Sequence, residues 1–178
     1  ARRFAAHLQL LDPGCEVPPP DLLPERHRRL PPHLFSAEDI AALMTEARLL
    51  RPSFRAATAE TVIGLLAVTG MRAGELVRLN RDDVDFTAGA PAVRATKFNK
   101  SRVLALHDTT VQALRAYAIV RDQRWPHAGS PAFFMSVKGS RLSQSALNVT
   151  FTALARAAGL EPAPSERGRR PTPHGLRH

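Results

Sequence analysis

The chain has 178 residues, 44% of them hydrophobic and 23% charged, which fits one globular domain with a buried core and excludes fibrous and disordered proteins. Its 25 Lys and Arg residues outnumber its 16 Asp and Glu residues, giving a formal net charge of +9; this favours a polyanionic partner, unless the Arg-rich composition only reflects codon usage. The single cysteine, Cys15, excludes an internal disulfide, and the longest apolar run, at 62–68, is too short to cross a membrane, so we expect a cytoplasmic protein with no membrane partner.

The first 32 residues divide into two segments. Phe4, Leu8 and Leu11 have helical spacing, which predicts that residues 1–11 are the end of a preceding domain. Residues 12–32 are dense in proline, which fixes extended backbone and indicates a linker. The main domain is therefore expected at 33–178. Because the chain starts without methionine and stops at His178, we expect it to be a piece of a longer protein.

The main domain is predicted to open with a helix. Ser36 can cap it, acidic residues fill its first turn, and apolar residues follow at helical spacing (Ile40, Leu43, Met44 and Ala47). The same spacing predicts helices at 57–68, ending at Gly70, and at 73–79, 109–124 and 143–158.

Between these helices the pattern changes to short runs that contain β-branched residues. Segments 92–97 and 102–106, joined by 98–101, predict a β-hairpin. Residues 133–135 form a short apolar segment, and a last helix is predicted to begin at Thr172. The fold class is therefore α+β: a mainly helical domain with a small antiparallel sheet or hairpin on one edge.

The first of three candidate sites lies where two predicted helices meet. Arg72 stands at the start of the helix that follows Gly70, close to unpaired backbone N–H groups, where an anion can bind. Glu75, one turn later, can fix the guanidinium. The alternative interpretation is an ordinary surface ion pair.

The second candidate is the hairpin tip, which carries Lys97, Lys100 and Arg102. Such a tip can enter a DNA groove, and a lysine whose pKa is lowered can donate a proton to a leaving oxygen. A solvated turn is the alternative.

The third candidate is the segment 172–178. A helix capped by Thr172 would place His174, Arg177 and His178 on one face, where a phosphate fits. The two histidines have the spacing of a zinc site, but Arg177 between them would oppose a metal, so we expect none. A surface location is the alternative here too. The chain has no Gly-rich phosphate loop and no dinucleotide fingerprint, so nucleotide chemistry is not expected.

In order and spacing, the three candidates resemble the tyrosine recombinases of the phage integrase family, whose signature is an arginine in T-G-x-R-x-x-E-L, a hairpin lysine and H-x-L-R-H. The resemblance covers about 33–178 and implies that the preceding residues belong to a core-binding domain and its linker. The catalytic residues that it implies are Arg72, Lys97, His174 and Arg177, with Glu75 and His178 as supports and Lys100 and Arg102 as DNA contacts.

The resemblance also implies an activity. Members of the family cleave and rejoin double-stranded DNA through a phosphotyrosyl intermediate, in site-specific recombination or integration of a phage or transposable element, without metal or cofactor. The full-length protein is then expected to self-associate on DNA. The nucleophilic tyrosine is expected after His178, since Tyr117, the chain's one tyrosine, falls in a predicted helix as a packing residue.

Three functions remain open from the sequence. The chain could be part of an active recombinase, a truncated and catalytically inactive DNA-binding remnant, or a basic protein-interaction domain. The coding sequence after His178 would separate the first two, and phosphate-dependent binding would separate both from the third.

Overall fold

A computed structural model describes residues 2–19, 22, 33–86, 92–97, 100–160 and 170–177, and for 92–97 and 100–103 it describes the backbone alone. Contacts divide the chain into two units, Ala1–Leu30 and Pro31–His178. In the first unit, helix α1 (Arg2–Leu11) buries no side chain of its own. The predicted helical spacing at 2–11 is confirmed.

The second unit is mainly helical. Its long helices are α2 (Ala37–Leu49), α3 (Ser53–Thr69), α5 (Asp108–Arg124) and α6 (Gln144–Ala157), and the short ones are α4 (Ala73–Arg78) and the 3₁₀ turns η1 (Arg81–Asp83) and η2 (Gly175–Arg177). The Ser36 cap is confirmed, with its hydroxyl accepting a hydrogen bond from the Asp39 N–H. Helix α3 begins before the expected 57, because Pro52 holds the N-cap backbone extended and the helix starts directly after it.

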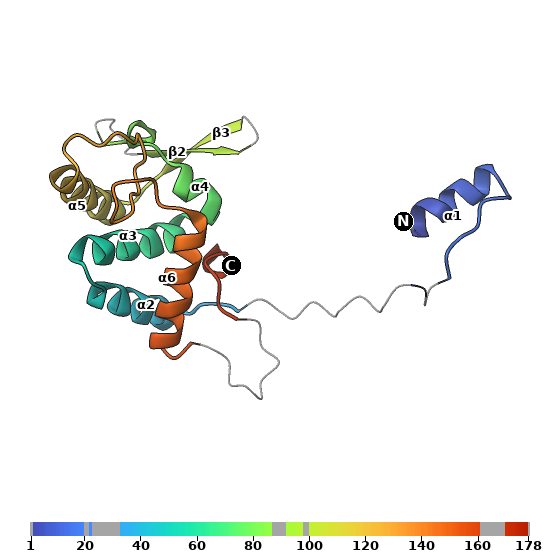
Figure 1. Ribbon diagram of the computed structural model, residues 1–178, viewed down its shortest axis with the longest axis horizontal. Helices are drawn as coiled ribbons and strands as arrows, with labels where there is room; N and C mark the ends of the chain where they lie inside the picture. Colours follow the sequence, from blue (N-terminus) through green and yellow to red (C-terminus); the bar gives the residue numbers. More distant parts are fainter. Residues whose placement is uncertain are drawn as a thin grey trace. The chain divides into compact units, whose positions relative to one another are not determined.

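A three-stranded antiparallel sheet lies at one edge of this unit (Figure 1). Strands β2 (Ala92–Lys97) and β3 (Lys100–Ala105) form the predicted hairpin, with Lys97 opposite Lys100 in the register. The second strand therefore starts two residues before the predicted 102. Strand β1 (Val84–Asp85) pairs with β2 and was not predicted, because two residues carry no recognisable alternation. The expected α+β fold class is confirmed.

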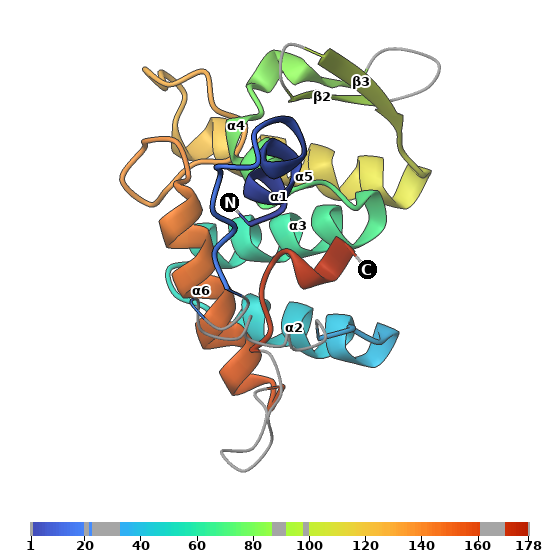
Figure 2. The same ribbon diagram turned by 90° about the vertical axis from the view of Figure 1, so that its right-hand side faces the viewer.

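Helix α3 is the centre of the core. It lies between α2 and α5 and also contacts α6 and η2 (Figure 2). Phe133 and Phe134 are fully buried, so the short apolar segment predicted at 133–135 belongs to the core. Tyr117 is buried as well, and its hydroxyl accepts a hydrogen bond from the Met135 N–H at 3.2 Å. This confirms Tyr117 as a packing residue. No helix within the described ranges is long and apolar enough to span a membrane.

The helix predicted from Thr172 is wrong over its described residues. The backbone forms turns instead, with hydrogen bonds from Gly175 N–H to Thr172 O (2.9 Å) and from Arg177 N–H to His174 O (3.2 Å). Both bonds close three-residue loops, the 3₁₀ pattern. Prolines are tolerated at the start of a helix, so Pro171 and Pro173 do not exclude one. The turn is instead selected by packing, because Gly175 lies directly against Phe35.

Candidate active site

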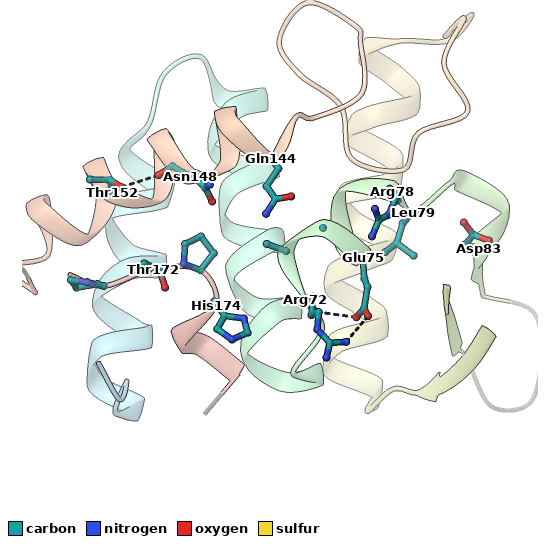
Figure 3. A pocket seen from close by; sticks show the side chains of 14 residues that line it. Arg72, Glu75, Arg78, Leu79, Asp83, Gln144, Asn148, Thr152, Thr172 and His174 are labelled. Atoms are coloured by element: carbon teal, nitrogen blue, oxygen red, sulfur yellow. Dashed lines mark hydrogen bonds and ion pairs between the residues drawn. The ribbon is translucent and has the colours of Figure 1, made fainter. Parts of the chain in front are cut away.

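An open cleft of about 940 Å³ lies between α4, α6 and the segment that leads into η2 (Figure 3). Arg72 and His174, which are far apart in the sequence, both line it. Its wall also includes polar residues that the sequence analysis did not assign to a site, namely Arg78, Asp83, Gln144, Asn148 and Thr152.

Arg72 is placed by the junction between two helices. Helix α3 ends at Gly70, whose φ of +58° lets the chain reverse direction, and Arg72 is then the N-cap of α4. The carboxylate of Glu75 accepts hydrogen bonds from the Arg72 backbone N–H and from its Nη1, both at 3.0 Å.

The Arg72–Glu75 pair differs from an ordinary surface pair in its burial. The Glu75 side chain is 2% exposed, whereas that of Arg72 is 38% exposed. A buried carboxylate bonded to both the backbone and the guanidinium fixes the direction of the arginine. Glu75 is bonded to Nη1, so the Nε and Nη2 groups of Arg72 can bind a further anion.

His174 directly precedes the turn η2, and Arg177 is the last residue of that turn. His174 is exposed and lines the cleft at the same end as Arg72 (Figure 3). Leu176, between them, is buried in the core and anchors the turn. Arg177 lies against the helix junction, since a Cβ added to Gly70 would be 3.6 Å from its Cγ. Arg177 is thus next to the loop that carries Arg72, although it is not among the residues that line the cleft.

The hairpin cations are placed by their backbone alone. Lys97 is the last residue of β2, and Lys100 and Arg102 belong to β3. Their side chains, and His178, lie outside the described part of the structure. The structure therefore brings Arg72, Glu75, His174 and Arg177 together and leaves the places of the other predicted side chains undescribed.

The residues that the sequence analysis missed form one side of the cleft. Gln144, Asn148 and Thr152 recur every four residues on α6, so they share one helical face. Gly74 leaves room for this wall, because a Cβ there would be 3.3 Å from Gln144 Oε1 and 3.6 Å from Arg78 Nη2. The four-residue spacing was visible in the sequence, but a polar helix face usually contacts water.

The cleft is suited to an anion. Its arginines are Arg72 and Arg78. Its two carboxylates already accept hydrogen bonds from the protein: Glu75 from Arg72, and Asp83 from the Asn80 N–H at 2.8 Å. A phosphate group can therefore meet guanidinium and imidazole donors without facing a free carboxylate from these two residues.

Known proteins share this sequence pattern and fold. The model of the phage integrase family matches residues 34–178. The protein y4rE of Sinorhizobium fredii, named as an integrase or recombinase, is 39% identical over 99% of the chain and 56% of its own length. Tyrosine recombinase XerD of Staphylococcus epidermidis is 31% identical over 87% of the chain and 49% of its own length. The chain spans about half the length of the curated relatives it matches.

Solved structures show the same fold. The XerH site-specific recombinase, in a pre-cleavage complex with difH substrate, matches with a TM-score of 0.65 at 22% identity, over 84% of this chain and 42% of that chain. A lambda integrase tetramer bound to a Holliday junction matches with a TM-score of 0.59 at 22% identity, over 84% of this chain and 41% of that chain. Because the family model covers the main domain from its entry segment to the final turn, the chain belongs to the phage integrase family of tyrosine recombinases.

Proposed function

We propose that this chain carries the phosphate-activating residues of a site-specific recombinase, which cleaves and rejoins double-stranded DNA through a phosphotyrosyl intermediate. The observation that carries the proposal is the meeting of Arg72 and His174 in one cleft, with Glu75 fixing the arginine. The family signature brings these residue types together for phosphoryl transfer, and the geometry of this cleft supports that use.

The two arginines clamp the scissile phosphate. Phosphoryl transfer places charge on the non-bridging oxygens, and preorganised guanidinium groups stabilise that charge without having to reorient. Arg72 supplies one clamp from the N-terminus of α4. Arg177, beside Gly70, supplies the other.

The reaction exchanges one P–O bond for another. A tyrosine oxygen attacks phosphorus, the bond to the 5′-oxygen breaks, and the products are a 3′-phosphotyrosyl link and a 5′-hydroxyl. Lys97 donates the proton that the 5′-oxygen takes up, and His174 assists proton movement at the nucleophile or holds a phosphate oxygen. The tyrosine comes from the rest of the longer protein, because Tyr117 is buried in the core.

The partner is double-stranded DNA. The hairpin residues Lys100 and Arg102 contact its backbone, and His178 supports the site next to Arg177. Residues 1–11 end a core-binding domain that joins the catalytic domain, 33–178, through the linker 12–32. The longer protein self-associates on DNA. By analogy, the XerH complex with difH substrate supports DNA binding, and the lambda integrase tetramer on a Holliday junction supports self-association.

The test is adduct formation by the longer protein on a nicked duplex that carries its site, identified by selection from random DNA. The unmodified protein is expected to form a covalent phosphotyrosyl adduct. Arg72→Ala and Arg177→Ala are expected to lose it, whereas Arg124→Ala, which removes an arginine that stacks on Trp125 outside the cleft, is expected to retain it. The proposal fails if Arg72→Ala and Arg124→Ala cleave equally well.

A further inference from the structure

Gly175 is enclosed by the first residues of the main domain. A Cβ added to Gly175 would lie 2.8 Å from Cε2 of Phe35 and 3.1 Å from the carbonyl oxygen of His33. Gly175 does not have a positive φ, so its backbone conformation is open to any residue. Glycine is therefore required here by space: the turn that carries His174 and Arg177 is pressed against the entry segment 33–35.

Phe35 is itself held firmly in place. Its ring packs edge to face with His33, with centroids 4.6 Å apart, and with Phe151 of α6, with centroids 5.9 Å apart. The next residue, Ser36, is fixed as the cap of α2. Such perpendicular ring contacts favour one orientation of the aromatic side chain. The Phe35 ring is therefore fixed between Phe151 of α6 and Gly175 of the turn.

The residues that follow Gly175 in the turn are also held by contacts. Leu176 is buried in the core, and the Arg177 stem rests over Gly70. Gly175 lies directly between His174 and Leu176, so a shift of this residue displaces the histidine on one side and the arginine on the other. Figure 1 shows the segment that enters α2 passing beside this terminal turn.

We infer that Phe35 is a positioning residue for His174 and Arg177, and that the point where the chain enters the domain thereby sets the geometry of the catalytic turn. The inference rests on the proposed function for its effect on cleavage, but the contact with Gly175 does not depend on it. Through this contact, a preceding domain that moves the entry segment can modulate cleavage without itself contacting the cleft.

The first experiment compares size changes on the two sides of the contact in the longer protein. Gly175→Ala is expected to slow single-turnover cleavage by up to about 10²-fold, because misplacement of catalytic groups by about 1 Å has that effect. The dissociation constant for DNA should change little, because many other phosphate contacts hold the duplex. Phe35→Leu combined with Gly175→Ala is expected to recover much of the rate, because leucine ends at its δ-carbons and removes the ring atom at 2.8 Å; the ring's Cδ2 lies at 3.4 Å.

Phe86→Leu is the matched control. Phe86 is also half-buried, but it packs beneath Arg81 and Arg115, so its truncation is expected to leave the cleavage rate unchanged. If the slow cleavage of Gly175→Ala came from a general loss of stability, Phe86→Leu would be slowed as well, and adding Phe35→Leu to Gly175→Ala would not restore the rate. The inference is overturned if Gly175→Ala cleaves normally, or if adding Phe35→Leu restores nothing.

A second experiment uses the 178-residue chain and requires no cleavage. The His174 ring signals, identified by their loss in His174→Gln, are followed by NMR as inorganic phosphate is added. Gly175→Ala is expected to move these signals and weaken phosphate binding, and the double variant is expected to reverse both changes. If the unmodified longer protein forms no adduct but this pattern holds, the proposed function fails and the positioning contact stands. Unmoved His174 signals in Gly175→Ala would overturn the inference itself.

Discussion

The buried phenol of Tyr117 can be followed by its absorbance on ionisation, because it is the chain's one tyrosine. Burial raises the pKa of Tyr117, with hydrogen bonds from Thr58 and the Met135 N–H opposing the shift. A raised folded-state pKa means that the neutral phenol is favoured in the native state. Its contribution to stability is therefore complete below the unfolded pKa of about 10 and is lost as the pH rises through the folded value.

Alkaline titration tests this placement, because the chain contains one tyrosine. Tyrosinate absorbance is expected to appear above the usual pH and together with the loss of helical circular dichroism. Tyr117→Phe should abolish the absorbance change, and it should destabilise the fold by about 1–3 kcal/mol because the buried Met135 N–H loses its partner. A reversible titration near the ordinary value, with intact helices, would show that Tyr117 is exposed and restore it as a candidate nucleophile.

Some contacts of single residues are visible in the sequence, and others are not. The Arg72–Glu75 contact could be predicted, because it joins positions three apart at the start of one helix. The wall formed by Gln144 and Asn148 could not, because a polar face at the correct spacing is compatible with water or with a cleft. Tertiary packing alone decides between these two environments.

Among the elements, helix α3 offers two glycines with opposite roles. Gly70 ends the helix in the left-handed region, with φ +58°, whereas Gly64 lies inside it. Gly70→Ala is expected to destabilise the fold by about 1–2 kcal/mol through backbone strain. The new methyl would make only an ordinary contact with Arg177, at 3.6 Å.

Gly64→Ala is the matched variant in the same helix. Its Cβ would lie 3.7 Å from Cε of Met44, so it fits, and the gain in helix propensity should stabilise the chain by about 0.5–1 kcal/mol. Denaturant unfolding measures both changes. Equal effects of the two substitutions would contradict the left-handed cap that places Arg72 at the start of α4.

Elements with a cap and an apolar stripe were predicted closely, as α2, α5 and α6 show. The errors arose where local signals are short or ambiguous. Strand β1 has two residues, and the segment from Thr172 carries helix-start residues that also suit a 3₁₀ turn. The close approach of Gly175 to Phe35 then selects the turn, and no local pattern in the sequence reveals a contact between residues so far apart.

For the molecule as a whole, the net charge of +9 should appear in the salt dependence of DNA binding. The 178-residue chain is expected to bind duplex DNA weakly and with little sequence preference, since most of its contacts would be to phosphates. The logarithm of its affinity should fall by about 0.9 for each phosphate contacted per tenfold increase in salt. Gel-shift titrations that show a salt-independent affinity would favour a protein-interaction domain instead.

In the proposed mechanism the role of Lys97 belongs to the whole molecule, since it requires the hairpin, the two arginines and the nucleophile to meet on one phosphate. Stabilising charge on that phosphate differs from supplying a proton to the leaving group, because only the second depends on the leaving atom. An alkoxide is a poor leaving group at neutral pH. Loss of a general acid should therefore slow cleavage by about 10²–10⁴, equivalent to about 3 to 5 kcal/mol of barrier.

A thiolate leaves without a proton, so replacing the bridging 5′-oxygen with sulfur separates the two roles. In the longer protein the sulfur substrate is expected to restore Lys97→Ala almost fully, while Arg72→Ala and Arg177→Ala stay slow because their defect is on the non-bridging oxygens. Lys100 is the comparison, since it lies opposite Lys97 in the β2–β3 register. As a proposed DNA contact, Lys100→Ala is expected to weaken DNA binding, but its single-turnover cleavage of the oxygen substrate at saturating DNA should be nearly normal. If sulfur rescued Lys100→Ala and not Lys97→Ala, the proton donor would be Lys100, and if it rescued Arg72→Ala equally well, no residue of the hairpin could be assigned as the general acid.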